Sequence, residues 1–157
     1  MTFSLRKRPM PLHALDVDDL NLDFVHRWWH GRRRGGLLPA RSAVDTPEFR
    51  LLVRDAGWIE VADDAAEHWS LGPLAGLLAG LPVGRAAALA AALRPDLEAI
   101  RFTGAVLVQE LTLTGPGIHL VRRQLVLPHA DDDTRVRDLL VVLGERRPVR
   151  AAGSLSG

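Results

Sequence analysis

The sequence predicts a single α+β domain, in which helices cover one face of an antiparallel sheet and an N-terminal helix caps it. Three segments rich in β-branched and apolar residues, 104–114, 118–127 and 136–143, follow one another near the C-terminus. Such composition favours strands. Segments 115–117 and 128–133 separate them with glycine, proline and aspartate, which favour turns and interrupt ladders. Short connections of this kind predict three consecutive antiparallel strands.

Length and composition fit one domain with tails. Of the 157 residues, 47% are hydrophobic and 25% are charged, which is enough apolar material for a sizeable core. We expect a flexible N-terminal tail over 1–17, the folded domain over 18–144, and a flexible C-terminal tail over 145–157. Terminal segments are loosely held unless other elements bind them.

Several classes of protein are disfavoured by composition. The absence of cysteine excludes disulfides and thiolate catalysis, and it is compatible with a reducing compartment. No apolar run is long enough to span a membrane, and no apolar segment follows the basic start as a secretory signal requires. We therefore expect a cytoplasmic protein. A net charge of +1 argues against wholesale nucleic-acid binding.

The first helix is expected from Asp18 or Asp19, either of which can cap it, to about His30. Its apolar residues form one broad stripe on a helical surface: Leu20, Leu22, Phe24, Val25, Trp28 and Trp29. Two adjacent tryptophans cannot point in the same direction on a helix. We expect core packing for both, and a homodimer contact through Phe24, Trp28 and Trp29 is the alternative.

Two histidines of this helix, His26 and His30, are four residues apart and share one face. This is metal-ligand spacing. No H-E-x-x-H arrangement is present, and no further ligand can be assigned. The pattern favours a solvated polar face, and no metal site is predicted.

The middle of the chain is read as a basic loop, short helices and a hairpin. Residues 32–41 form a loop by their glycines and proline, and the segment between Pro39 and Pro47 is expected to be extended. Thr46 can cap a short helix that begins at Pro47. Segments 58–62 and 66–71 would form a hairpin. A helix over 84–93 and a second short helix from Pro95 to Arg101 follow.

The predicted strands alternate, so that odd and even residues lie on opposite faces. Both faces are partly apolar. A sheet of this kind is covered on one side by helices and contacts something else on the other. That second cover is either the N-terminal helix or another subunit.

Two motifs of the sequence are considered together. The first is Trp28–Trp29 followed by the basic loop, Gly35 to Arg41 (GGLLPAR) and Asp45. The second is a strand ending at Leu125 to Pro128, an acidic turn over 131–133, and the apolar strand that contains Leu139 to Val142. In this order and spacing the two motifs resemble those of a bacterial PAS-like family (the PAS_5-like family). The order of elements, from capping helix through hairpin and helical middle to three antiparallel strands, is also similar to that of a PAS domain.

The resemblance covers roughly residues 18–143 and implies a fold and a function. It implies a PAS-like domain that acts as a non-catalytic sensory or regulatory module in signalling, often as a homodimer, and binds a small ligand or a protein partner. One departure is the short segment 57–72, where family members usually carry a longer hairpin. The ligand pocket would be lined by inward residues, namely Trp69, Leu107, Leu111, Val121 and Leu125. The alternative for each is a dry core, and the ligand and any cofactor remain open.

Two other functions fit individual features. A nucleic-acid binder could combine phosphate contacts from arginine and lysine with base stacking on tryptophan, using Arg6, Lys7, Arg8, Arg32, Arg33, Arg34, Trp28 and Trp29. A small enzyme could use a general acid–base pair such as His119 and Glu110 on neighbouring strands. Its other candidates are His68, His129 and Asp131 to Asp133. The nearly balanced charge and the absence of a recognised motif weigh against both.

Overall fold

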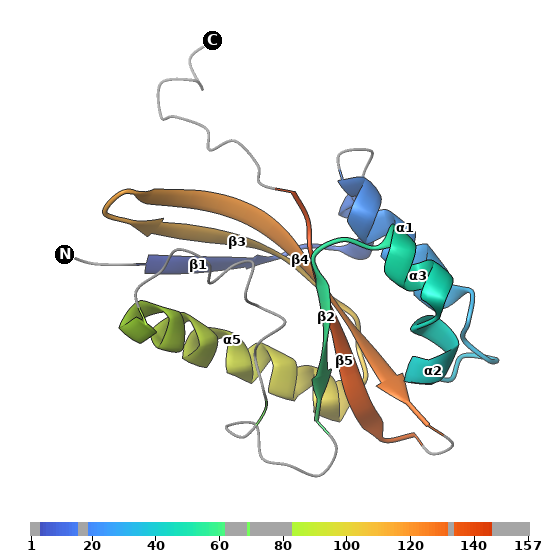
Figure 1. Cartoon of the computed structure of the whole chain (residues 1–157). Coiled ribbons are helices and arrows are strands. Elements are labelled where there is room, and N and C mark those ends of the chain that lie inside the picture. The colour runs from blue at the N-terminus through green and yellow to red at the C-terminus, as the bar shows by residue number, and fades with distance from the viewer. Residues whose placement is uncertain (1–3, 16–18, 62–68, 70–82, 132–133, 146–157) are drawn as a thin grey trace.

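A computed structural model describes residues 4–15, 19–61, 69, 83–131 and 134–145. They form an α+β fold around one antiparallel sheet (Figure 1). The strands lie in the order β1-β3-β4-β5-β2, with bounds Ser4–Pro9 (β1), Leu107–Gly115 (β3), Ile118–Ala130 (β4), Val136–Leu143 (β5) and Ala56–Glu60 (β2). None of the described helices is long and apolar enough to span a membrane.

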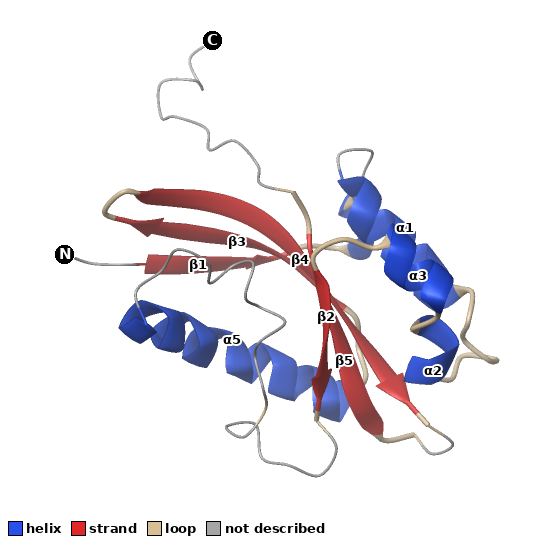
Figure 2. Ribbon diagram, in the orientation of Figure 1, coloured by secondary structure: helices blue, strands red, loops and turns tan. Residues whose placement is uncertain are grey.

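Helices cover both faces of the sheet (Figure 2). α5 (Val83–Thr103) covers one face, and α1 (Leu20–His30), α2 (Arg41–Val44) and α3 (Pro47–Leu52) cover the other. The central strand β4 is buried along almost its whole length. Its alternate residues belong to two separate clusters, Leu120 and Val126 beneath α5 and Leu125 and Leu127 beneath α1. The predicted strands and their alternation are confirmed, and the N-terminal helix is the second cover.

The two tryptophans of α1 point in different directions, as expected. Trp29 is 1% exposed and lies against the sheet, where its indole N–H donates to the Pro128 carbonyl at 3.0 Å. Trp28 turns towards α3, and its ring lies 5.8 Å from that of Phe49. The expected cap is wrong for Asp19, because its carboxylate makes no cap hydrogen bond and pairs with Arg123 of β4 instead.

The region after the basic loop is more helical than expected. Residues 41–44 form one turn of helix, so the prediction of an extended segment between the prolines is wrong. Proline restricts the residue immediately before it and leaves the rest of the segment unconstrained. The cap at Thr46 is confirmed, since its hydroxyl accepts from the Phe49 amide at 3.3 Å.

α5 is one continuous helix, although a break at Pro95 was expected. Proline removes one backbone hydrogen bond and displaces the carbonyl four residues earlier, here that of Ala91. Lys7 supports the weakened turn, because its ammonium donates to the Ala92 carbonyl and pairs with Asp96, both at 2.9 Å.

The expected flexible tail over 1–17 is wrong for β1. Ser4–Pro9 pairs with β3 from Ser4↔Thr114 to Pro9↔Gln109. Leu5 packs on the cluster beneath α5, and Lys7 reaches that helix. These contacts bind a segment that its composition alone would leave loose.

Two other expectations lie largely outside the described residues. β2 is confirmed near its predicted place and pairs with β5, whereas the second hairpin strand, 66–71, is undescribed except for Trp69. The C-terminal tail is undescribed from residue 146 onward. β4 continues to Ala130, beyond the predicted turn at Pro128, with an irregular register between His129 and Ala130.

The role of Lys7 can be tested by replacing it with methionine. Lys7→Met keeps an aliphatic side chain and removes both contacts to α5, so we expect the free energy of unfolding to fall by about 1 to 2 kcal/mol. Arg8→Met, which removes the more exposed pair with Glu110, should cost about 0.5 kcal/mol or less. Urea denaturation measures both variants. Equal losses would contradict a special role for Lys7.

Candidate functional site

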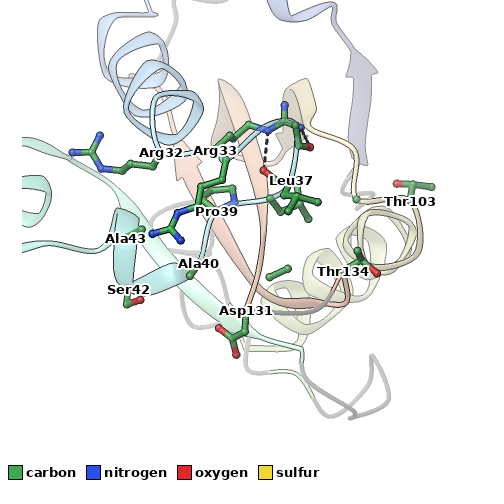
Figure 3. A pocket seen from close by; sticks show the side chains of 15 residues that line it. Arg32, Arg33, Leu37, Pro39, Ala40, Ser42, Ala43, Thr103, Asp131 and Thr134 are labelled. Carbon is green, nitrogen blue, oxygen red and sulfur yellow. Dashed lines mark hydrogen bonds between the residues drawn. The ribbon is translucent and has the colours of Figure 1, made fainter.

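A cavity of about 670 Å³ lies where the basic loop, α2, the end of α5 and the β4–β5 connection meet (Figure 3). Small-molecule sites typically occupy about 300 to 1,000 Å³, so this volume suits a small ligand. Figure 3 shows Ser42 and Ala43 on one side and Thr103 on the other. The lining comes from three separate stretches of the chain: Arg32, Arg33, Arg34, Gly36–Ala40, Ser42 and Ala43; Thr103 and Gly104; and Ala130, Asp131 and Thr134.

The basic loop is shaped by a tight turn. Gly35 and Gly36 have φ values of 57° and 89°, and the Leu37 amide donates to the Arg34 carbonyl at 3.0 Å. Two consecutive residues with positive φ are typical of hairpin turns that glycine favours. A Cβ atom at either position would meet nothing within 4 Å. Backbone conformation, rather than space, therefore requires glycine here.

Arg33 bonds across this turn, and the neighbouring Arg32 is held against α1. Arg33 donates from Nε to the Leu37 carbonyl at 3.3 Å and from Nη2 to the Gly36 carbonyl (Figure 3). The guanidinium of Arg32 stacks 3.4 Å from the Trp28 ring centroid and donates to the Trp28 carbonyl at 3.0 Å. Stacking on an aromatic face suits the planar guanidinium. Both side chains are thus positioned by carbonyl oxygens and rings.

The loop is joined to the sheet just behind the cavity. The Ala130 amide donates to the Pro39 carbonyl at 3.1 Å. The neighbouring Leu38 packs against both hydrophobic clusters, the one beneath α5 and the one beneath α1. The cavity wall therefore touches both helical layers of the fold.

A buried histidine lies next to this junction. His129 is fully buried, with its ring 4.6 Å from that of Trp58 and 6.5 Å from that of Trp29, in edge-on geometry. Its Nδ1 lies 3.0 Å from the Leu127 carbonyl and so carries a proton, while Nε2 has no hydrogen-bond partner among the described residues. Burial lowers the pKa of His129 to about 3, and the charge of Arg41 acts in the same direction. The ring is therefore neutral at pH 7.

Arg41 connects α2 to the edge of the sheet. Its Nη1 lies 3.2 Å from Asp138 of β5 and 3.3 Å from Glu60 of β2, and its guanidinium lies 4.7 Å from the Trp58 ring centroid. Asp45 lies 3.9 Å away and also pairs with Arg50. Burial raises the pKa of Asp138, and Arg41 opposes that shift. The motif residues Arg41 and Asp45 thus secure the helices to the sheet.

The five residues predicted to line a pocket do not surround one space. Register pairs Leu111 with Arg122 and Val108 with Leu125, so Leu111 and Leu125 lie on opposite faces. Trp69, Leu107 and Leu111 belong to the cluster beneath α5, whereas Leu125 belongs to the cluster beneath α1. Val121 shares the face of Leu125. None of the five lines the cavity described above.

The residues predicted for a dimer contact pack mainly against other residues of the same chain. Trp29 is buried, and Phe24 and Trp28 are half-buried against Phe49, with ring centroids 6.4 and 5.8 Å from it. The large exposed apolar side chains nearby are Leu20, Leu51 and Leu52. They lie at the adjacent ends of α1 and α3, which Asn21 joins by hydrogen bonds to the backbone of Arg54.

The structure also shows the surroundings of the residues named for the nucleic-acid-binding hypothesis. Trp29 is buried and Arg32 covers one face of the Trp28 ring, so base stacking on either ring would require rearrangement. Lys7 and Arg8 pair with Asp96 and Glu110.

The proposed acid–base pair is not formed. His119 lies opposite Thr114, while Glu110 lies opposite Arg123. Four residues along a strand correspond to roughly 13 Å. The structure describes His129 and Asp131 of the other candidates, whereas His68, Asp132 and Asp133 lie outside the described residues.

The cavity was missed by sequence reasoning because its walls are distant in the chain. The loop itself was identified, and Arg32 to Arg34 beside Gly35 and Gly36 were the available signal. No family model, curated protein or solved structure matches the chain. The site is therefore interpreted from its geometry.

The buried histidine predicts a pH dependence. The unfolded state binds a proton near pH 6.5, whereas the folded state does so near pH 3, so stability falls as the pH is lowered between these values. Relative to His129→Gln, the wild-type protein should lose about 2 kcal/mol between pH 7 and pH 5. Urea denaturation at both pH values measures this difference. The exposed His119→Gln variant is the control, and equal pH dependence of wild type and His129→Gln would contradict the assignment.

Proposed function

We propose that this chain is a PAS-like, non-catalytic sensory or regulatory module that binds a small molecule in the cavity at the basic loop. The cavity carries this proposal. It has the volume of a ligand site and is bounded by the loop between α1 and α2 and by the end of α5. These elements belong to opposite helical layers. A ligand seated there contacts both.

This position suggests how occupancy is converted into a signal. A ligand shifts a conformational equilibrium only when it binds one arrangement better than another. A ligand that touches both the basic loop and the end of α5 favours one spacing of the two layers. A partner protein that contacts α1 or α5 then senses the change. This mechanism needs no catalytic residue.

The order of elements supports the PAS-like assignment. After β1, the helix α1, the strand β2, the long helix α5 and a meander of β3, β4 and β5 follow in that order. In addition, the motif residues Gly36 and Pro39 line the cavity, and Arg41 pairs with Asp138 of the sheet. The proposal includes a cytoplasmic location and a homodimer. Leu20, Leu51 and Leu52 offer the exposed apolar surface for that dimer.

Native mass spectrometry of protein purified gently from its own host, or a close substitute, tests the proposal. We expect a dimer mass plus a defined increment for a retained small molecule. Ala43 lines the cavity and is exposed, so Ala43→Trp should fill the space and abolish the increment. Ala91→Trp, at an exposed site on α5 that does not line the cavity, should retain it. Wild-type protein without an increment, or an increment that survives in Ala43→Trp, would contradict ligand binding at this place.

A further inference from the structure

We propose that the ligand of this cavity is a small organic anion, recognised through a phosphate or carboxylate group by the arginines of the basic loop. The inference rests on the proposed function and specifies the chemistry of its ligand. It is carried by the unneutralised charge of Arg32, Arg33 and Arg34, by the fixed positions of Arg32 and Arg33, and by the mixed lining of the cavity.

The three arginines differ from most other cations in the part of the chain that the structure describes. No ion pair joins Arg32, Arg33 or Arg34 to a carboxylate of the described residues. By contrast, the described ion pairs include Lys7, Arg8, Arg27, Arg41, Arg50, Arg122 and Arg123. The acidic residue among the described lining is Asp131, which is exposed. Positive charge is therefore in excess around the cavity.

Two of these cations are already positioned. Arg33 uses two of its N–H groups on the carbonyls of Gly36 and Leu37, and Arg32 uses one on the Trp28 carbonyl. A guanidinium has five N–H donors, so donors remain on each for a ligand. Carbonyl oxygens fix these groups without cancelling their charge. An anion that binds here therefore requires little additional ordering of the Arg32 and Arg33 side chains.

Arg34 is the residue through which the inference is most easily tested. Its side chain is exposed and makes no hydrogen bond or ion pair with the described residues, although its backbone closes the glycine turn. Such a side chain contributes little to stability. It lines the cavity, where it can close over a bound anion with paired N–H donors.

The remaining lining fits the rest of an organic molecule. Hydroxyl groups of Ser42 and Thr134 offer neutral hydrogen bonds, and Leu38, Pro39 and Ala43 offer apolar surface. Inorganic phosphate alone would leave most of about 670 Å³ unfilled. An anionic head with an apolar body matches both parts of the lining.

Isothermal titration calorimetry on the full chain tests this inference with three probes of similar size. Phenyl phosphate and hexanoate represent the two anionic groups, and hexanamide is the neutral counterpart of hexanoate. We expect at least one anion to bind, with affinity that falls with added salt, and hexanamide to bind at least tenfold more weakly. A preference between phenyl phosphate and hexanoate identifies the group.

The matched variants are Arg34→Gln and Arg54→Gln. Arg54 is also exposed, but it does not line the cavity. Arg34→Gln should weaken binding of the anion by about tenfold or more and leave the melting temperature unchanged. Arg34→Lys should recover part of the affinity for the anion. Arg54→Gln should leave that affinity unchanged. Equal losses in the two glutamine variants, or no binding of either anion, would overturn the inference.

The test separates this inference from the function on which it rests. If hexanamide binds as tightly as hexanoate, and Ala43→Trp abolishes that binding, the cavity is a ligand site but the ligand is not selected by charge. That result overturns the anion inference and retains the proposed function. Tight binding of a mixed-sequence oligonucleotide without binding of either small anion would overturn the inference and favour the nucleic-acid alternative.

Discussion

The backbone hydrogen bond from Ala130 to Pro39 joins the basic loop to the end of the central strand. It lies where the β4–β5 register is irregular, and such irregularities redirect the groups at a strand end. Residues next to Pro39 and Ala130 make further contacts between the loop, α1 and the sheet. Leu38 packs against both hydrophobic clusters, and the Trp29 indole N–H donates to the carbonyl of Pro128, two residues before Ala130 in β4. Without this junction the loop would have no fixed position opposite α5, and the cavity would have no second wall.

The buried sheet and the basic loop treat their polar groups differently. Within the sheet, the Gln109 side chain donates to that of Gln124 at 2.7 Å, and Arg123 pairs with Asp19 and Glu110. The Arg123 Nε and the Gln124 Nε2 nevertheless make no hydrogen bond with the described residues. His129 keeps a neutral ring between two tryptophans at the cost of an unsatisfied Nε2. At the loop, carbonyl oxygens orient Arg32 and Arg33 and leave their charge in place. A nearly neutral chain thus concentrates positive charge at one cavity.

Much of the fold could be predicted because it depends on local pattern. β-branched and apolar composition between turn residues predicted the three C-terminal strands, and Thr46–Pro47 predicted the start of a helix. Relations between distant segments could not be read in the same way. Cross-strand register places Leu111 and Leu125 on opposite faces, although each strand alone is compatible with a shared pocket. β1 is held by Lys7 contacts with α5, about 85 residues away, and the cavity forms only where three distant segments meet. Gly35 and Gly36 predicted the loop, but they did not predict which segments lie opposite it.

Nuclear magnetic resonance of the full-length, ¹⁵N-labelled protein during a titration with phenyl phosphate tests the central claim most directly. The account predicts saturable shifts of backbone amides on both sides of the cavity, in residues 32–38, 40–43, 103, 104, 130, 131 and 134. The simultaneous response of the basic loop and the end of α5 is the essential result. Shifts confined to β1 around Arg6 and Arg8, or shifts that do not saturate, would contradict an anion site that bridges the two helical layers.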